Sequence, residues 1–190
     1  MPSLTNDKKI AKVSSSTAAA LDAPSVDVGG FRQFLSALKG EWLSRLGSES
    51  RSKFIELQAR GEISLSDISG EELLNLYNED RLFFREEQLH RNVLRSIKLP
   101  LDPTKLGATP IILVELPDNK GFLIMNGNHR VYKVMESADF GSNSVYLVKM
   151  SARAFEEVFG MEVRQRVFDG HIDWGCPWPT ITDKKRTVSN

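Results

Sequence analysis

The stretch that decides the fold is PIILVELPDNKGFLIMNGNHRVYKVM, residues 110–135. It opens with a β-branched apolar run at 110–116, continues with turn residues at 117–121, and has a second apolar run at 122–125. Two such runs around Pro, Asp, Asn and Gly predict a hairpin with a five-residue loop. Apolar residues then recur at helical spacing. The stretch therefore predicts two strands followed by a helix.

The turn before this helix reads Asn126-Gly127-Asn128-His129-Arg130. Gly127 permits a backbone conformation that most residues avoid, and Asn128 can cap a helix that begins near His129. The first amides of such a helix have no intrahelical partners and attract anions. Two basic residues oppose the helix dipole unless an anion is bound. We therefore expect a phosphate-binding turn formed by Asn126, Gly127, Asn128, His129, Arg130 and, one turn further on, Lys133.

A hairpin is the alternative at this turn, because Asn-Gly is also the strongest two-residue hairpin signal. In that alternative, residues 122–125 turn back into a strand at 128–134. Against it, Val131, Val134 and Met135 lie at offsets 0, 3 and 4, which favours a helix. The helix is the preferred interpretation, and the hairpin remains an alternative.

The segment before residue 100 predicts helices. The first is a core-facing helix weakened at Gly40, and the second covers about 50–60 and stops at Gly61. Ser69 and Glu72 have the spacing of a capping box, which predicts a third helix. The fourth runs from about 85 to 98, before Pro100. Their apolar residues are Phe31, Phe34, Leu35, Leu38 and Trp42; Phe54, Ile55 and Leu57; Leu73, Leu74, Leu76 and Tyr77; and Leu89, Val93, Leu94 and Ile97.

Beyond residue 140 the pattern predicts a strand at 145–150 and a helix capped by Ser151 and ended by Gly160. The inward residues of this helix are Phe155, Val158 and Phe159. Residues 175–179 must be irregular, because two prolines flank Trp178. Trp174 and Trp178 either close an edge of the core or form a partner surface, and core closure is the commoner outcome.

Chain length, charge and cysteine content limit the class of protein. A chain of 190 residues suits one compact domain with a tail, and 25 basic against 25 acidic residues create no strong overall field. The lone Cys176 cannot form an internal disulfide, which fits a reducing compartment. No apolar run reaches membrane-spanning length. We therefore expect a cytoplasmic protein with a flexible tail at 1–28, a helical part at 29–100, a core at 101–183 and a second tail at 184–190.

Two further groups are candidates for binding. Arg91, Arg95 and Lys98 lie at offsets 0, 4 and 7, so a helix there shows a basic stripe that either contacts DNA phosphates or is solvated surface. Residues 169–173 place Asp169, His171 and Asp173 at alternate positions, but a polar loop is a better explanation than a metal site. No residue is assigned as a metal ligand. Carboxylates that sequence cannot rank as ligands are Glu79, Asp80, Glu115, Asp169 and Asp173.

The order of strand 110–116, turn, strand 121–125, Asn126-Gly-Asn-His-Arg130, helix and strand 145–150 resembles the core of the ParB/sulfiredoxin superfamily. The resemblance implies an α/β (α+β) fold with a small mixed sheet, here with a helical N-terminal extension. It also implies that the turn and following helix bind the phosphates of ATP, with Mg²⁺ as a candidate ion. Its implied catalytic residues are His129, Arg130 and Asn128.

The motif departs from three branches of that superfamily. Asn128 stands where sulfiredoxins carry a nucleophilic cysteine, so repair of sulfinic acids is not expected. Asn128 and His129 replace the Glu-Arg pair of the partition proteins, and no helix-turn-helix pattern follows. Asn126 replaces an aspartate of the serine-kinase branch, which removes a carboxylate.

Size, helical extension and this variant motif are together similar to the plasmid-encoded fertility-inhibition proteins with oncogenic suppression activity. That similarity implies a bacterial cytoplasmic ATPase and DNase that blocks conjugative DNA transfer by type IV secretion. The implied partners are the transferred plasmid DNA or T-DNA and a secretion or coupling-protein component, without membrane insertion. The alternative is a non-catalytic inhibitor that binds DNA or nucleotide and blocks that component by protein contact.

Overall fold

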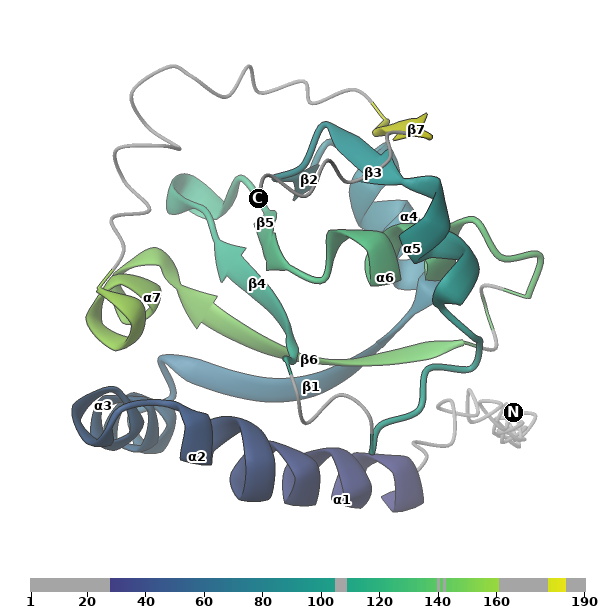
Figure 1. The fold of residues 1–190 in the computed structure, drawn as a ribbon. Coiled ribbons are helices and arrows are strands. Elements are labelled where there is room, and N and C mark those ends of the chain that lie inside the picture. Colours follow the sequence, from purple (N-terminus) through teal and green to yellow (C-terminus); the bar gives the residue numbers. More distant parts are fainter. Residues whose placement is uncertain (1–27, 105–108, 140, 142, 161–177, 184–190) are drawn as a thin grey trace, which may run out of the picture.

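The computed structural model describes residues 28–104, 109–139, 141, 143–160 and 178–183. The fold is mixed α/β, as predicted, and centres on a five-stranded sheet in the order β1-β6-β4-β5-β2 (Figure 1). Within this sheet β1 and β6 are antiparallel, as are β4 and β5, whereas β4 and β6, and β2 and β5, are parallel. The strands are β1 Ile63–Ser69, β2 Leu82–Phe84, β4 Ile111–Glu115, β5 Phe122–Asn126 and β6 Ser144–Ser151.

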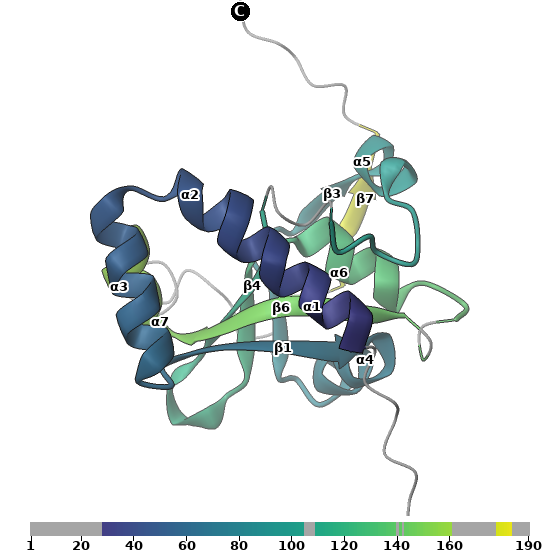
Figure 2. The same cartoon turned by 90° about the horizontal axis from the view of Figure 1, so that it is seen from below.

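Helices cover both faces of this sheet (Figures 1 and 2). One apolar cluster joins the sheet to the N-terminal helices and α7, and a second joins it to α4, α5 and α6. Seen from below, α1 crosses beneath the sheet and α3 lies beside α7 (Figure 2). The helices are α1 Val28–Ala37, the π-helix η1 Leu38–Trp42, α2 Leu43–Arg45, α3 Ser48–Ala59, α4 Gly70–Asn78, α5 Arg91–Ser96, the 3₁₀ turn η3 Pro117–Asn119, α6 Asn128–Met135 and α7 Ala152–Phe159.

The apolar run at 111–114 forms the centre of the sheet. Ile112 and Val114 face the cluster with the N-terminal helices, while Ile111 and Leu113 face the cluster with α4–α6. A strand buried on both faces reads as a continuous apolar run, because alternate side chains enter two different cores. The predicted hairpin is confirmed, since β4 and β5 pair antiparallel around η3.

The first predicted helix is confirmed, and its weak point is a local change of helix type. Phe34, Leu38 and Trp42 are buried in the core, as their spacing indicates. Gly40 lies inside η1, between α1 and α2. A single π-turn of this kind widens the helix locally, and the low helix propensity of glycine makes such a change less costly there.

The second and third predicted helices are also confirmed, with one error. Phe54 and Leu57 of α3 are fully buried, but Ile55 is 53% exposed and adds nothing to the core. The capping box forms at α4, where Ser69 Oγ accepts from the Glu72 amide at 3.1 Å. The Glu72 carboxylate in turn accepts from the Ser69 amide at 3.0 Å.

The fourth predicted helix is wrong over its first half. Instead of a helix from 85, an irregular segment at 85–87 follows β2, then comes the short strand β3 Gln88–His90, and only then α5. Strand β3 pairs in parallel with β7 Thr180–Thr182 to form a second, two-stranded sheet. Leu89 is fully buried on this strand, whereas Val93 of α5 is 42% exposed. A pairing partner 92 residues away therefore overrides the helical spacing of 89–97.

The C-terminal helix matches its prediction. Ser151 Oγ caps α7 by accepting from the Ala154 amide at 3.1 Å, and Gly160 ends the helix. Trp178 packs on Tyr77 and Tyr132, with ring centroids 4.8 and 5.0 Å apart, so it closes a core edge as expected. The sequence predictions for residues 1–27, 161–177 and 184–190, with Trp174 and Cys176 among them, lie outside the described residues.

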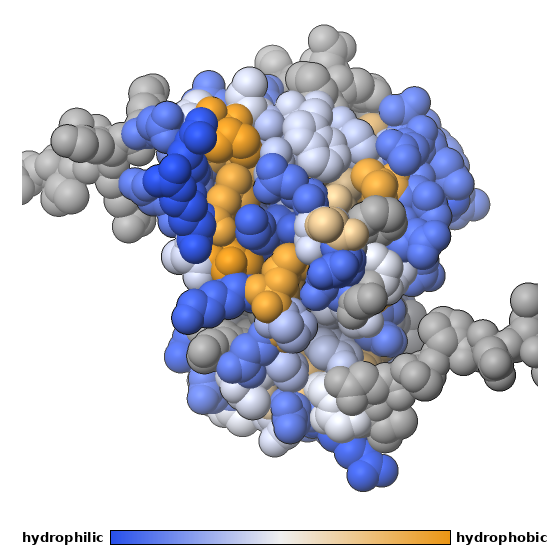
Figure 3. All heavy atoms as spheres, turned by 90° about the vertical axis from the view of Figure 1, so that its right-hand side faces the viewer, coloured by the Kyte–Doolittle hydropathy of each residue, from blue (hydrophilic) through white to orange (hydrophobic). Residues whose placement is uncertain are grey.

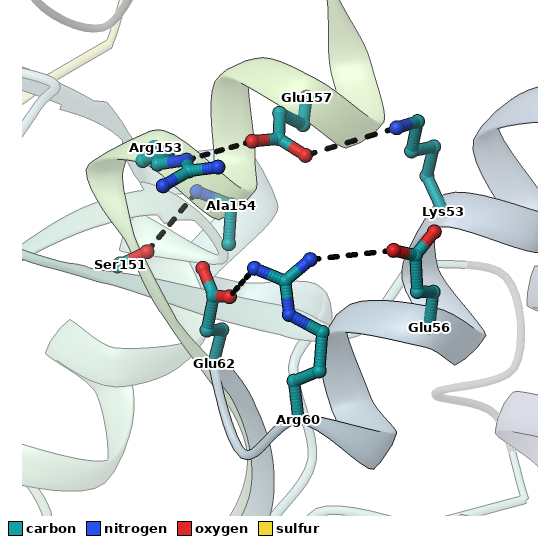
Figure 4. Close-up of polar contacts among 8 residues, drawn as sticks. All are labelled: Lys53, Glu56, Arg60, Glu62, Ser151, Arg153, Ala154 and Glu157. Atoms are coloured by element: carbon teal, nitrogen blue, oxygen red, sulfur yellow. Dashed lines mark hydrogen bonds and ion pairs between the residues drawn. The ribbon is translucent and has the colours of Figure 1, made fainter.

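Ion pairs join α3, α7 and the residue before β1 at the surface (Figure 4). Arg60 pairs with both Glu56 and Glu62. Glu157 accepts from Arg153 at 2.8 Å and lies 4.0 Å from Lys53 of α3. Exposed ion pairs stabilise little individually. The buried Trp42 of η1 does more to hold α3 and α7 together, because its ring lies 5.5 Å from that of Phe54 in α3 and 6.1 Å from that of Phe159 in α7.

Candidate anion site at the start of helix α6

Helix α6 begins at Asn128, directly after β5, so the hairpin alternative at this turn is wrong. Gly127 is the residue before the helix and has φ of +93°. Left-handed backbone costs other residues energy, because Cβ approaches the carbonyl oxygen. Asn128 does not cap the helix as expected, because it is already the first helical residue and its side chain bonds instead with the Arg85 amide and the Ile124 carbonyl.

The neighbours of Gly127 leave no room for a side chain. A Cβ atom there would lie 2.7 Å from Cγ1 of the buried Ile111 and 3.2 Å from Nη2 of Arg130. The Arg130 guanidinium therefore folds back over the glycine, beside the start of β4. Absence of a side chain at Gly127 is what allows this close approach.

Arg130 lines an open cleft of about 410 Å³ between the start of α6 and the chain that leads from α5 to β4. Burial lowers the pKa of Arg130 to about 10, which still leaves the guanidinium charged at neutral pH. Among the described residues, no hydrogen-bond acceptor or carboxylate is paired with this guanidinium. The other lining residues are Ser96, Ile97, Lys98, Pro100, Leu101, Asp102 and Thr109.

Lys98, predicted to contact DNA, lines the same cleft as Arg130. The fold thus brings together one member of the predicted basic stripe and the arginine of the predicted phosphate turn. The other two members lie elsewhere: Arg91 forms an ion pair of 2.7 Å with Asp183, and Arg95 is exposed without lining the cleft. Asp102 supplies the cleft's carboxylate and accepts from the amide and hydroxyl of Thr104.

Asn128 and His129, both predicted at the site, are used in contacts with the segment between β2 and α5. The buried Asn128 accepts from the Arg85 amide at 3.0 Å and donates to the Ile124 carbonyl at 3.2 Å. His129 Nε2 accepts from the His90 amide at 2.9 Å. Its Nδ1 lies 3.5 Å from Glu86 Oε2. Of α6, it is Arg130 and not Asn128 or His129 that lines the cleft.

The environment of His129 favours the neutral ring. Burial lowers its pKa below the usual 6.5, the Glu86 carboxylate opposes this shift, and nearby His90 adds to it. The hydrogen bond from the His90 amide fixes the tautomer, because Nε2 can accept only while it carries no proton. The proton then lies on Nδ1, facing Glu86.

The predicted phosphate residues Asn126 and Lys133 do not line the cleft. Asn126 donates to the Pro110 carbonyl and so ties the end of β5 to the start of β4. Lys133 is one turn further along α6. The candidate carboxylates Glu79, Asp80 and Glu115 are exposed.

No group of three or more His, Cys, Asp or Glu side chains suited to a metal ion occurs within the described ranges. Residues 169–173 fall outside those ranges, so the expectation for Asp169, His171 and Asp173 stays a prediction.

Sequence reasoning missed Glu86, His90, Asp102 and Thr109. Glu86 and His90 contact His129 from about 40 positions earlier in the chain, and no local spacing announces such a pairing. Asp102 and Thr109 flank the cleft on a connection that carries only turn signals. For these residues the sequence offers no usable signal.

The side of the molecule on which α5 lies is largely hydrophilic. Figure 3 shows a narrow apolar strip with hydrophilic residues on both sides of it. In the part of the chain that the structure describes, no helix has both the length and the apolar character to cross a lipid bilayer.

The resemblance to the ParB/sulfiredoxin superfamily rests on the sequence pattern of residues 110–150. No protein-family model, curated protein or solved structure matches the chain. The family assignment, and the role that comes with it, therefore stay predictions.

Proposed function

We propose that the chain binds the phosphate groups of ATP, or of a DNA backbone, in the cleft lined by Arg130 and Lys98. The observation that carries the proposal is the largely buried Arg130 guanidinium, which faces an open cleft and has no anionic partner among the described residues. Burying an unpaired cation is costly, so an anion that enters the cleft is favoured. Phosphate suits this cation, because its oxygens match the planar fork of arginine.

The other lining groups suit the same ligand. Lys98 adds a second positive charge on a flexible stem, and Thr109 adds a hydroxyl donor, whereas the Ser96 hydroxyl already donates to the Val93 carbonyl at 2.7 Å. The volume of about 410 Å³ lies in the range of small-molecule pockets, which span roughly 300–1,000 Å³. A nucleotide, or one or two nucleotides of a single strand, fits such a space better than a duplex does.

The role we propose for this binding is the one that the sequence resemblance implies. A bacterial cytoplasmic protein of the ParB/sulfiredoxin type would use the cleft while it inhibits DNA transfer by type IV secretion. Its partners would be the transferred DNA and a component of the secretion or coupling machinery. Mg²⁺, where needed, would arrive with the nucleotide phosphates.

Of the two versions of this role, binding without hydrolysis has the stronger support. In the enzymatic version, which comprises ATP hydrolysis and DNA cleavage, His129 acts as acid or base. Both nitrogens of His129 are already occupied by the His90 amide and Glu86, which leaves the ring unsuited to proton transfer with a ligand. Arg130 remains suited to neutralising phosphate charge in either version.

Calorimetric titration of ATP into Arg130→Ala tests the proposal, with Arg95→Ala as the matched control. Loss of a charge-assisted hydrogen bond costs about 1.5–3 kcal/mol, so affinity should fall about tenfold to a hundredfold in Arg130→Ala. Arg95 lies outside the cleft, so its variant should bind like the wild type. Equal affinity of Arg130→Ala and wild type, or absence of binding to wild type, overturns the proposal.

The same variant separates the two versions when ATP hydrolysis, DNA cleavage and transfer inhibition are measured in parallel. Loss of all three in Arg130→Ala supports the enzyme. Inhibition that persists without catalysis supports blockade by contact. If His129→Ala leaves both hydrolytic rates unchanged, a chemical role for His129 is excluded.

A further inference from the structure

The segment that precedes α5 is fastened to the first turn of α6 by polar contacts at both Asn128 and His129. The Arg85 amide donates to Asn128 Oδ1 at 3.0 Å, and Asn128 Nδ2 lies 3.5 Å from Glu86 Oε1. The His90 amide donates to His129 Nε2 at 2.9 Å. Glu86 thus touches both helical residues, since its second oxygen lies 3.5 Å from His129 Nδ1.

These contacts join the two helices that carry or precede the cations of the cleft, Lys98 and Arg130. His90 is the residue before α5, and Lys98 follows the end of that helix by two positions. Arg130 follows His129 directly on α6. The contact between His90 and His129 therefore fixes the position of α5, and with it Lys98, relative to the Arg130 guanidinium. The rings of His90 and His129 also stack, with centroids 5.9 Å apart.

The contact at His129 depends on the charge of its ring. A proton on Nε2 would remove the acceptor and turn two N–H groups toward each other. Among the described residues, the charged and titratable groups around His129 are Glu86, its ion-pair partner Arg85, His90, and the α6 residues Arg130 and Lys133. Glu86 alone in this set favours the charged ring, and burial outweighs it.

We infer that Glu86 and His129 are positioning residues that hold α5 and Lys98 against α6, and that protonation of His129 releases this hold and weakens phosphate binding. The predicted effect on phosphate binding rests on the proposed function. The contact through which His129 positions α5 does not depend on that function. Because burial lowers the pKa of His129 below 6.5, the hold is complete above that pH. It is lost as the pH falls through the lower, folded-state value.

The first measurement is hydrogen exchange of the His90 amide in the full chain, without ligand. His129→Phe keeps a ring but removes both nitrogens, and the exchange rate of the His90 amide should rise about tenfold. His129→Gln keeps one acceptor and a donor without titrating, and should restore protection in part. Unchanged exchange in His129→Phe overturns the inference.

The second measurement is the affinity for ATP between pH 5 and 8. Titration of ATP itself affects all variants equally. The ratio of each variant's affinity to the wild-type affinity therefore reports the titration of the protein alone. Wild type should lose affinity about tenfold more than His129→Gln as the pH falls below 6.5. His90→Gln is the matched control, because it removes the neighbouring imidazole and keeps the backbone donor. It should lose affinity at low pH as wild type does, with the loss displaced to higher pH because His90 no longer lowers the pKa of His129.

The outcomes separate the inference from the proposed function. If wild type binds no ATP at any pH while His129→Phe still exposes the His90 amide, the proposed function fails and the hold stands. If ATP binds and wild type and His129→Gln share one pH profile, the proposed function stands and the regulatory inference fails.

Discussion

Replacement of Gly127 by alanine probes the packing that brings Arg130 to the cleft. The variant forces a non-glycine residue to adopt φ of +93°, which costs about 1–2 kcal/mol. It also places Cβ 2.7 Å from Ile111 Cγ1, and Ile111 has no exposed surface onto which it can move. Overpacking of this kind costs about 1–3 kcal/mol more. The free energy of unfolding should therefore fall by about 2–5 kcal/mol.

Gly61→Ala is the matched control for this experiment. Gly61 has φ of +77°, but nothing lies within 4 Å of the Cβ position that alanine would add. That variant should lose only the backbone part, about 1–2 kcal/mol. Urea denaturation followed by circular dichroism gives both values. If the two variants lose equal stability, the tight contact between Gly127 and Ile111 is refuted.

Two further predictions concern stability, and urea denaturation checks both. Phe54→Ala should destabilise the protein by about 3–5 kcal/mol, whereas Ile55→Ala should change it by less than about 0.5 kcal/mol, because Phe54 is fully buried and Ile55 is 53% exposed; similar losses at the two positions would contradict the orientation of α3. Ser69→Ala should cost about 1 kcal/mol through loss of the α4 cap, while Ser52→Ala on the exposed face of α3 should be neutral; no difference between the serines would count against the capping box.

Elements with strong local signals could be predicted from the sequence. The run at 111–114 is apolar at every position because it is buried on both faces, and few other structures produce such a run. Ser151 and Gly160 mark the two ends of α7 because each satisfies backbone groups that a helix leaves unpaired. In both cases the residues that determine the element lie within it.

Elements set by distant partners could not be predicted. Strand β1 contains three serines and an aspartate, and its alternation breaks, since Ile63 and Leu65 pack on one face of the sheet and Ile68 on the other. Its strand conformation comes from pairing with β6, where Ile63 faces Met150. Strand β3 likewise depends on β7. Where local strand propensity is weak, tertiary contacts determine the secondary structure.

The candidate site shows the same division. Its helix start was predicted because Gly127 and the apolar spacing after Arg130 are local signals. The engagement of His129 was not, because its partners Glu86 and His90 precede it by about 40 residues. A histidine beside an arginine suggests chemistry in a sequence, whereas the fold gives the two side chains different surroundings.

The strand order has a consequence for any attempt to cut the chain at residue 100. The outer strands β1 and β2 both come from before that point, and they cover the edges of β6 and β5. A fragment that begins at 101 would present two uncovered rows of amide and carbonyl groups, together with the apolar surface that now meets Phe34 and Leu57. Unpaired strand edges and exposed apolar surface promote aggregation by strand pairing between molecules. Expression of a fragment that begins at 101 would thus yield inclusion bodies rather than a folded domain.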